Sequence, residues 1–267
     1  MKTFIHAFLF VTAAALTSYP QSVPVPVVDL KTRGLLGGVQ NGRWLAPSRI
    51  SPLMKIETEF LLVGWTGVEE GGVALGKKGE TEDVCSDFVR MELDLTADLG
   101  VAIGSNARWK PAPRIAAKLS PTSAAYTAVV RNYLAKKGIV KPVIRITQAY
   151  RIDLDADGMD EVVITATSYK NGLASNAARG DYSFVLVRKT AGKTVSEYLL
   201  AGDFITKKVD FGAPSQYLVS AIADLNGDGK MEIVVAGQYY EGESASAFEI
   251  KGGRPVEIKE FQIACGV

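Results

Sequence analysis

The sequence is poor in the side chains that most enzymes use as acids, bases or nucleophiles. Its 267 residues include one histidine, His6, and two cysteines, Cys85 and Cys265. His6 lies in an N-terminal segment that we expect to be removed, so the mature protein would contain no histidine. This excludes Ser-His-Asp and Cys-His catalysis, histidine-ligated zinc and the usual general base at neutral pH. The composition therefore disfavours an enzyme of these kinds.

Long hydrophobic runs and an excess of charge of one sign are also missing. After the N-terminal segment, no stretch reaches the roughly 18 apolar residues that indicate a membrane-spanning helix, so no membrane span is expected. Lysine plus arginine number 30 and aspartate plus glutamate 29. The net charge therefore indicates no polyanionic partner, and binding to nucleic acid is not expected. We expect an ordinary globular protein that is a monomer.

The first residues, 1–21, have the pattern of a signal peptide. Lys2 gives the positive start, and FIHAFLFVTAAAL gives a short apolar stretch that ends in small residues. Cleavage is expected between Ala15 and Ser22, where no cysteine could carry a lipoprotein anchor. We therefore predict an exported protein, secreted or periplasmic. In such a compartment the two cysteines are predicted to form a disulfide, with two free thiols as the alternative.

Residues 22–142 are expected to form an N-terminal module of strands and one helix. YPQSVPVPVVDL, at residues 19–30, is typical of a proline-rich extended linker. The pair Asn41-Gly42 between apolar runs predicts a tight hairpin turn. Strands are predicted at residues 54–65 and 88–95.

One helix is well specified, over about residues 121–137. Ser120 is its expected cap, and Pro121 suits its first position. Apolar residues recur on one face, and Gly138 can end the helix in the left-handed conformation. This helix is the only one that the sequence predicts clearly.

The remaining segment, 143–267, predicts eight strands in two sets of four. They cover residues 143–152, 161–169, 182–189 and 194–202, then 216–223, 231–240, 246–252 and 254–261. In each set an acidic loop separates the first strand from the second, and the loops start at Asp153 and Asp224, 71 residues apart. This internal repeat predicts a mainly β (β-rich α+β) fold with two four-stranded antiparallel units, which need neighbours to bury their faces.

Both loops carry oxygen ligands in the same frame. Calcium takes about six to eight oxygens, from carboxylates and carbonyls among others. The candidate ligands of the first loop are Asp153, Asp155, Asp157, the carbonyl of Met159, and Glu161; those of the second are Asp224, Asn226, Asp228, the carbonyl of Lys230, and Glu232. Carboxylates this close repel one another unless a cation neutralises them. The sequence therefore predicts two Ca²⁺ sites, with solvent-facing acidic turns as the alternative.

The loop form D-x-[DN]-x-D-G-x-x-[DE] followed by an apolar strand resembles the FG-GAP or VCBS repeats of integrin-α-like β-propellers. An EF-hand is excluded, because position twelve is Ile164 or Val235 in a predicted strand, and not a glutamate followed by a helix. The resemblance covers residues from Val143 onward. It implies one calcium in each loop and two propeller-blade-like units packed on the N-terminal module. The sequence departs from the family in lacking a GAP after each second strand. Glutamate stands at position nine where aspartate is usual, which leaves direct ligation by Glu161 and Glu232 open.

These features predict an exported, non-catalytic calcium-binding module for binding, adhesion or structure, with an unidentified protein or glycan partner. The alternative is a carboxylate-dependent hydrolase acting on glycans, with calcium as a scaffold and Glu241 and Glu243 as candidates for its acidic pair. The segment 108–151 is rich in Lys and Arg and lacks acids, and it is either a solvated face or a surface for an anionic ligand. Since Asp155 matches Asn226, the count of carboxylates favours tighter binding by the first loop.

Overall fold

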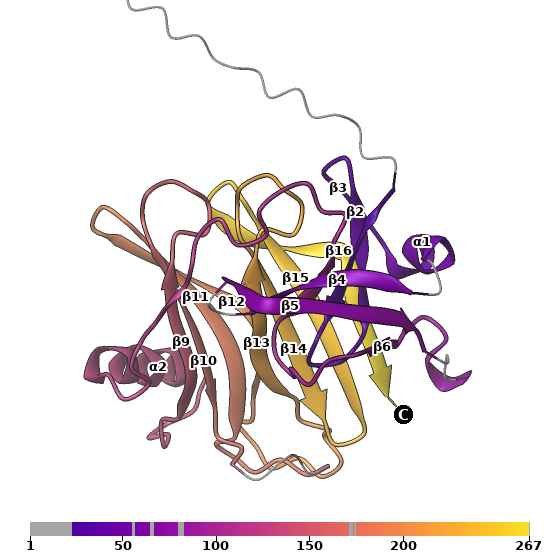
Figure 1. Ribbon diagram of the computed structural model, residues 1–267. Coiled ribbons are helices and arrows are strands. Elements are labelled where there is room, and N and C mark those ends of the chain that lie inside the picture. Colours follow the sequence, from indigo (N-terminus) through magenta and orange to yellow (C-terminus); the bar gives the residue numbers. More distant parts are fainter. Residues whose placement is uncertain are drawn as a thin grey trace, which may run out of the picture.

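The computed structural model describes residues 23–54, 57–64, 67–79, 83–170, 173 and 175–266. Strands make up 51% of the chain and helices 10%, with one clear helix, so the prediction of a mainly β fold is confirmed (Figure 1). The predicted signal peptide, residues 1–21, lies outside the described residues. Within them, no helix is both long enough and apolar enough to cross a membrane.

The strands form three antiparallel sheets. The seven-stranded sheet has the order β3-β2-β1-β7-β4-β5-β6 and consists of β1 (Val25–Asp29), β2 (Leu35–Gln40), β3 (Arg43–Leu45), β4 (Thr58–Gly64), β5 (Gly67–Lys78), β6 (Met91–Leu93) and β7 (Val101–Gly104). The five-stranded sheet has the order β12-β11-β10-β9-β8 and consists of β8 (Ala117–Lys118), β9 (Ile146–Ile152), β10 (Glu161–Thr167), β11 (Tyr182–Ala191) and β12 (Thr194–Phe204). The four-stranded sheet has the order β13-β14-β15-β16 and consists of β13 (Gln216–Ala223), β14 (Glu232–Tyr239), β15 (Gly242–Lys251) and β16 (Arg254–Gly266). The described helices are α1 (Pro47–Ile50) and α2 (Ala124–Lys136), with the 3-10 turns η1 (Ser51–Leu53) and η2 (Asp83–Cys85).

Each of the eight strands predicted in the C-terminal segment corresponds to an observed strand, β9 to β16. Within each set of four, consecutive strands are hydrogen-bonded neighbours, so each set is an antiparallel meander. The short β8 adds an edge strand to the first set, and its two residues gave no signal in the sequence. The acidic loops join β9 to β10 and β13 to β14, between the first and second strand of each set as predicted.

The three sheets pack face to face, with the four-stranded sheet in the middle. Val163 of β10 shares a core cluster with Ile233 and Val235 of β14. Val234 of β14 belongs instead to a second cluster, with Val27 of β1. Successive side chains of a strand point to opposite faces, so β14 is buried on both sides. This burial explains the continuous apolar run at residues 233–236 of β14, all of which are buried.

Helix α2 covers the outer face of the five-stranded sheet, beside β9 and β10 in Figure 1. Val130 and Leu134 are fully buried there, in a cluster with Ile164 and Phe184. Burying side chains of this size stabilises the fold by about 1.5 to 3 kcal/mol each. The helix therefore closes one end of the stack of sheets.

The predicted start of the helix was wrong, whereas its end was right. The helix begins at Ala124, three residues after Pro121, and Ser123 is its cap residue. The hydroxyl of Ser120 pairs with that of Thr122, 3.0 Å away, and the two residues belong to a turn before the helix. At the other end Gly138 has a φ of +83°, the left-handed stop that the sequence predicted.

The N-terminal module departs furthest from the sequence predictions. The proline-rich segment is not a linker, because Val25–Asp29 forms the fully buried strand β1 between β2 and β7. Pro26 is the second residue of β1, and the described pairing with β7 starts only at Val27, so the missing N–H of the proline falls near the end of the strand. The predicted turn at Asn41-Gly42 is confirmed: both residues have positive φ and join β2 to β3. The strand predicted at residues 54–65 corresponds to the shorter β4, and the strand predicted at residues 88–95 corresponds to the shorter β6.

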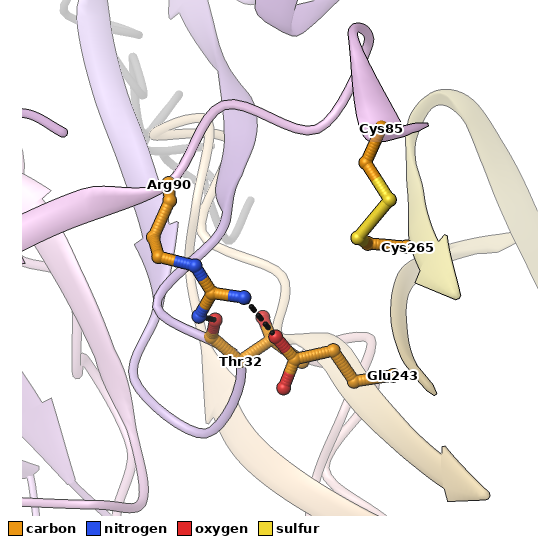
Figure 2. The surroundings of a disulfide bond; sticks show 5 residues. All are labelled: Thr32, Cys85, Arg90, Glu243 and Cys265. Atoms are coloured by element: carbon orange, nitrogen blue, oxygen red, sulfur yellow. Dashed lines mark hydrogen bonds and ion pairs between the residues drawn. A yellow bond between two sulfur atoms is a disulfide. The ribbon is translucent and has the colours of Figure 1, made fainter. Parts of the chain in front are cut away.

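A disulfide and an ion pair tie the N-terminal module to the C-terminal strands. Cys85 and Cys265 are bonded, as predicted, across 180 residues of sequence. The guanidinium of Arg90 donates to a carboxylate oxygen of Glu243 at 2.8 Å and to the carbonyl of Thr32 at 3.3 Å. Figure 2 shows these contacts close to the disulfide. Both links join the module to the four-stranded sheet.

Candidate metal centre

The two acidic loops lie side by side at neighbouring ends of the stacked sheets. The backbone N–H of Met231 in the second loop donates to the carbonyl of Leu154 in the first, at 2.8 Å. The sheets are also joined further along, where the side-chain amide of Gln148 in β9 both donates to and accepts from the backbone of Val219 in β13. Residues 71 positions apart in the sequence thus become neighbours.

Side chains of the segment between β7 and β8 form hydrogen bonds to the backbone of both loops. The guanidinium of Arg114 donates to the carbonyl of Asp153 at 2.6 Å and to that of Gly229 at 2.7 Å. The indole N–H of Trp109 donates to the carbonyl of Asp224 at 2.9 Å. The sequence had placed Arg114 only within the basic segment 108–151, since nothing local relates it to residues so far along the chain. This arginine is a clamp on the two loops.

We expect Arg114→Ala to lower the free energy of unfolding by about 2 kcal/mol, because two close backbone carbonyls lose a charged donor. Chemical denaturation would measure the change. Arg108→Ala is the matched control, since Arg108 is an exposed arginine of the same segment. Equal stability of the two variants would contradict the role of Arg114 as a clamp.

In the first loop, backbone hydrogen bonds fold the chain around its acidic side chains. The carboxylate of Asp153 accepts from the N–H groups of Asp157 at 3.2 Å and Gly158 at 3.0 Å. Glu161, only 2% exposed, turns back so that its Oε2 accepts from the N–H of Leu154 at 2.9 Å. Carboxylate oxygens of Asp153, Asp155 and Glu161 lie within 4.8 Å of one another. This group could hold a metal ion, as the sequence predicted for the first loop.

A lysine that was not predicted from the sequence forms ion pairs with acids of the first loop. The Nζ of Lys189, in β11, lies 2.6 Å from Asp155 Oδ2, 2.9 Å from Asp157 Oδ2 and 2.9 Å from Glu161 Oε1. The lysine side chain is 15% exposed. Burial lowers the pKa of Lys189, but its hydrogen bonds to Asp155, Glu161 and Asp157 outweigh this, and the net shift is upward. The hydrogen bond from Lys189 also lowers the pKa of Asp157.

The second loop repeats the backbone pattern of the first. The carboxylate of Asp224 accepts from the N–H groups of Gly227 at 2.6 Å and Gly229 at 2.9 Å. Oε2 of Glu232 accepts from the N–H of Leu225 at 2.8 Å, as Glu161 does with Leu154. The two loops therefore share two features: the bond from the glycine to the first aspartate and the bond from the N–H of the second residue to the closing glutamate.

The charges around the second loop are different. Glu232 is 1% exposed, and its Oε1 has no hydrogen-bond partner within the described part of the chain. Burial raises the pKa of Glu232 well above its usual range, and the carboxylates of Asp228, Asp224 and Glu249 raise it further. Burial likewise raises the pKa of Asp224. In the ranges described, no lysine or arginine forms an ion pair with Asp224, Asp228 or Glu232.

The structure brings together part of the predicted ligand set. Three carboxylates converge in the first loop, whereas Asn226 replaces one of them in the second, and no group of three acids of that kind occurs there among the described residues. The backbone N–H groups of Met159 and Lys230 donate to Asp157 and Asp228 respectively. Ligation by the carbonyls of Met159 and Lys230 stays a prediction.

Glu243, a candidate for the acidic pair of a hydrolase, is held by Arg90. Its carboxylate joins the N-terminal module to β15, at the disulfide shown in Figure 2. That position gives Glu243 a structural role in connecting the sheets. The hydrolase hypothesis gains no specific observation from it.

The fold and the loops define a β-rich protein with two acidic strand-loop-strand units, one of which groups carboxylates that could hold a metal ion. Comparisons with protein-family models, with curated proteins and with solved structures found no match. The resemblance to FG-GAP or VCBS repeats therefore stays a prediction. Function must be inferred from the geometry of the loops.

Proposed function

We propose that this chain is an exported, non-catalytic calcium-binding protein in which at least one of the two acidic loops binds Ca²⁺ and so fixes the ends of two packed sheets. The observation that supports this most is shared by both loops. The glutamate that closes each loop, Glu161 or Glu232, is buried and turned back onto it. A buried carboxylate facing other carboxylates is unfavourable unless a cation neutralises it.

The donor set supports calcium over other metals. The candidate ligands are carboxylate, amide and carbonyl oxygens, and both cysteines are in the disulfide. Zinc and copper favour sulfur and nitrogen donors, whereas magnesium gives up its water ligands reluctantly. Extracellular calcium modules bind with a Kd of about 10⁻⁴ to 10⁻³ M, which fits loops of this kind in an exported protein. The bound metal would give a rigid edge for recognising a protein or glycan partner.

A thermal melt of residues 22–267 tests the proposal. In 10 mM calcium, about 10 to 100 times the expected Kd, one occupied site should stabilise the protein by about 1.5 to 3 kcal/mol. For a chain of this size that corresponds to a rise in Tm of about 5 °C relative to excess EGTA. Magnesium at the same concentration should give a smaller rise.

The rise should disappear in the double variant Asp155→Ala/Asp228→Ala. The charge-matched control is Asp87→Ala/Asp98→Ala, which removes two exposed acids outside the loops. Calcium should stabilise this control as it does the unmodified chain. If calcium leaves the Tm of the unmodified chain unchanged, the loops are acidic turns and the proposal fails.

A further inference from the structure

We infer that the two loops have diverged: the ammonium group of Lys189 is a built-in cation that neutralises the first loop, and the second loop is the one that requires a metal cation. This inference rests on the proposed function, because it takes calcium as the ligand of the second loop. It assigns the metal to Asp224, Asn226, Asp228 and Glu232.

The contacts of Lys189 place its charge where a cation is needed. Its Nζ is within 2.9 Å of oxygens from Asp155, Asp157 and Glu161, which are three of the predicted ligands of the first loop. Two of these residues, Asp155 and Glu161, belong to the group of carboxylates that could hold a metal. Calcium would sit about 2.3 to 2.6 Å from the same oxygens. It therefore cannot share them with an ammonium group, so Lys189 must leave before the metal binds.

The β-sheet register shows that the second loop has the opposite charge at the matching place. In the first repeat Val162 of β10 pairs with Arg188 of β11, and Lys189 is the next residue. In the second repeat Ile233 of β14 pairs with Phe248 of β15, and the next residue is Glu249. Val162 and Ile233 each follow the glutamate that closes their loop. A lysine beside one loop thus corresponds to a glutamate beside the other.

With Glu249 in place of a lysine, the second loop has an excess of negative charge. Oε1 of the buried Glu232 has no hydrogen-bond partner in the described ranges, although Oε2 is fixed by the N–H of Leu225. Among the described residues, Glu249 forms an ion pair with Lys251, whose Nζ lies 2.5 Å from Glu249 Oε1 and whose side chain is 65% exposed. A cation bound within the loop is the simplest partner for Glu232.

With Lys189 included, the expected order of affinity reverses. The count of carboxylates alone favoured the first loop, because it has Asp155 where the second has Asn226. The ammonium group cancels that advantage, since calcium must displace it to bind. We therefore expect one calcium per chain, in the second loop.

Calcium titration of residues 22–267 by calorimetry, carried to about 10 mM free metal so that a site with the expected Kd is filled, tests the inference through stoichiometry. The unmodified chain should bind one equivalent. Lys189→Gln should bind two, because it removes the built-in cation and keeps a side chain of similar length. Lys193→Gln, at an exposed lysine in the turn after β11, is the matched control and should still bind one.

Two further variants keep the test valid if Lys189→Gln does not fold. Glu232→Gln should lose the single equivalent, whereas Glu161→Gln should retain it. Two equivalents in the unmodified chain, or loss of the one equivalent in Glu161→Gln alone, would overturn the inference and leave calcium binding intact. If neither the unmodified chain nor any of the variants binds calcium, the proposed function is refuted.

Discussion

Replacing both cysteines, in Cys85→Ser/Cys265→Ser, should lower the free energy of unfolding by about 4 kcal/mol, or the Tm by about 10 °C. The disulfide closes a loop of 180 residues, so it restricts a large part of the unfolded chain. It also links η2 to β16, whose sheet shares no backbone ladder with the seven-stranded sheet among the described strands. Chemical denaturation of the double variant and of the oxidised parent would give the two free energies.

The neighbouring ion pair provides a control for the disulfide. Arg90→Met removes the ion pair with Glu243 across the same junction but leaves the disulfide in place. The side chains of Arg90 and Glu243 are 40% and 25% exposed, so solvent screens the pair and the loss should be only about 1 kcal/mol. A double cysteine variant as stable as the Arg90→Met variant would show that the disulfide contributes little, and that the packed faces hold the junction.

The glutamates that close the two loops should have effects of opposite sign when calcium is removed. In EGTA, Glu161→Gln should lower the free energy of unfolding by about 3 kcal/mol, because it removes a buried partner of Lys189. Glu232→Gln should raise it by about 1 kcal/mol, because it removes a buried charge that has no cationic partner among the described residues. The amide oxygen can still accept from Leu225, and the neutral amide no longer repels the carboxylates of Asp224 and Asp228, which raise the pKa of Glu232.

Addition of calcium should change the stability of these two variants differently. The unmodified chain and Glu161→Gln should gain stability on addition of the metal, whereas Glu232→Gln should not. Thermal melts of the three proteins, each in EGTA and in 10 mM calcium, would measure this. Destabilisation by both substitutions in EGTA would mean that Glu232 has a cationic partner without metal.

Much of the fold was predictable because its signals are local. Alternating and continuous apolar runs marked all eight strands of the C-terminal segment, and Asn41-Gly42 marked the hairpin between β2 and β3. Gly138 marked the end of α2, since a left-handed residue is needed there. The segment before β2 was misread because prolines usually indicate a linker. Whether such a segment is buried depends on the strands that pack beside it, and the sequence of the segment does not contain that information.

In the candidate metal centre, too, the local features were predictable from the sequence and the contacts between distant segments were not. The spacing of acids and glycines in each loop predicted a tight acidic turn, and the first aspartate of each loop does accept hydrogen bonds from backbone N–H groups a few residues along the chain. The charge that neutralises each loop comes from another strand. Lys189 beside the first loop and Glu249 beside the second are set by the register of β11 and β15.

The sequence by itself determined the eight strands from β9 to β16, the two loops and the pairing of the two cysteines, because each depends on residue types and on spacings along the chain. Only the tertiary structure decided that the three sheets stack and that Arg114 clamps both loops. It also decided that Lys189 of β11 lies against the acids of one loop, and that Oε1 of Glu232 in the other has no hydrogen-bond partner among the described residues. The physical reason is distance. Electrostatic and packing energies depend on which groups lie within a few ångströms of each other, and that is fixed only when segments far apart in the sequence adopt one register.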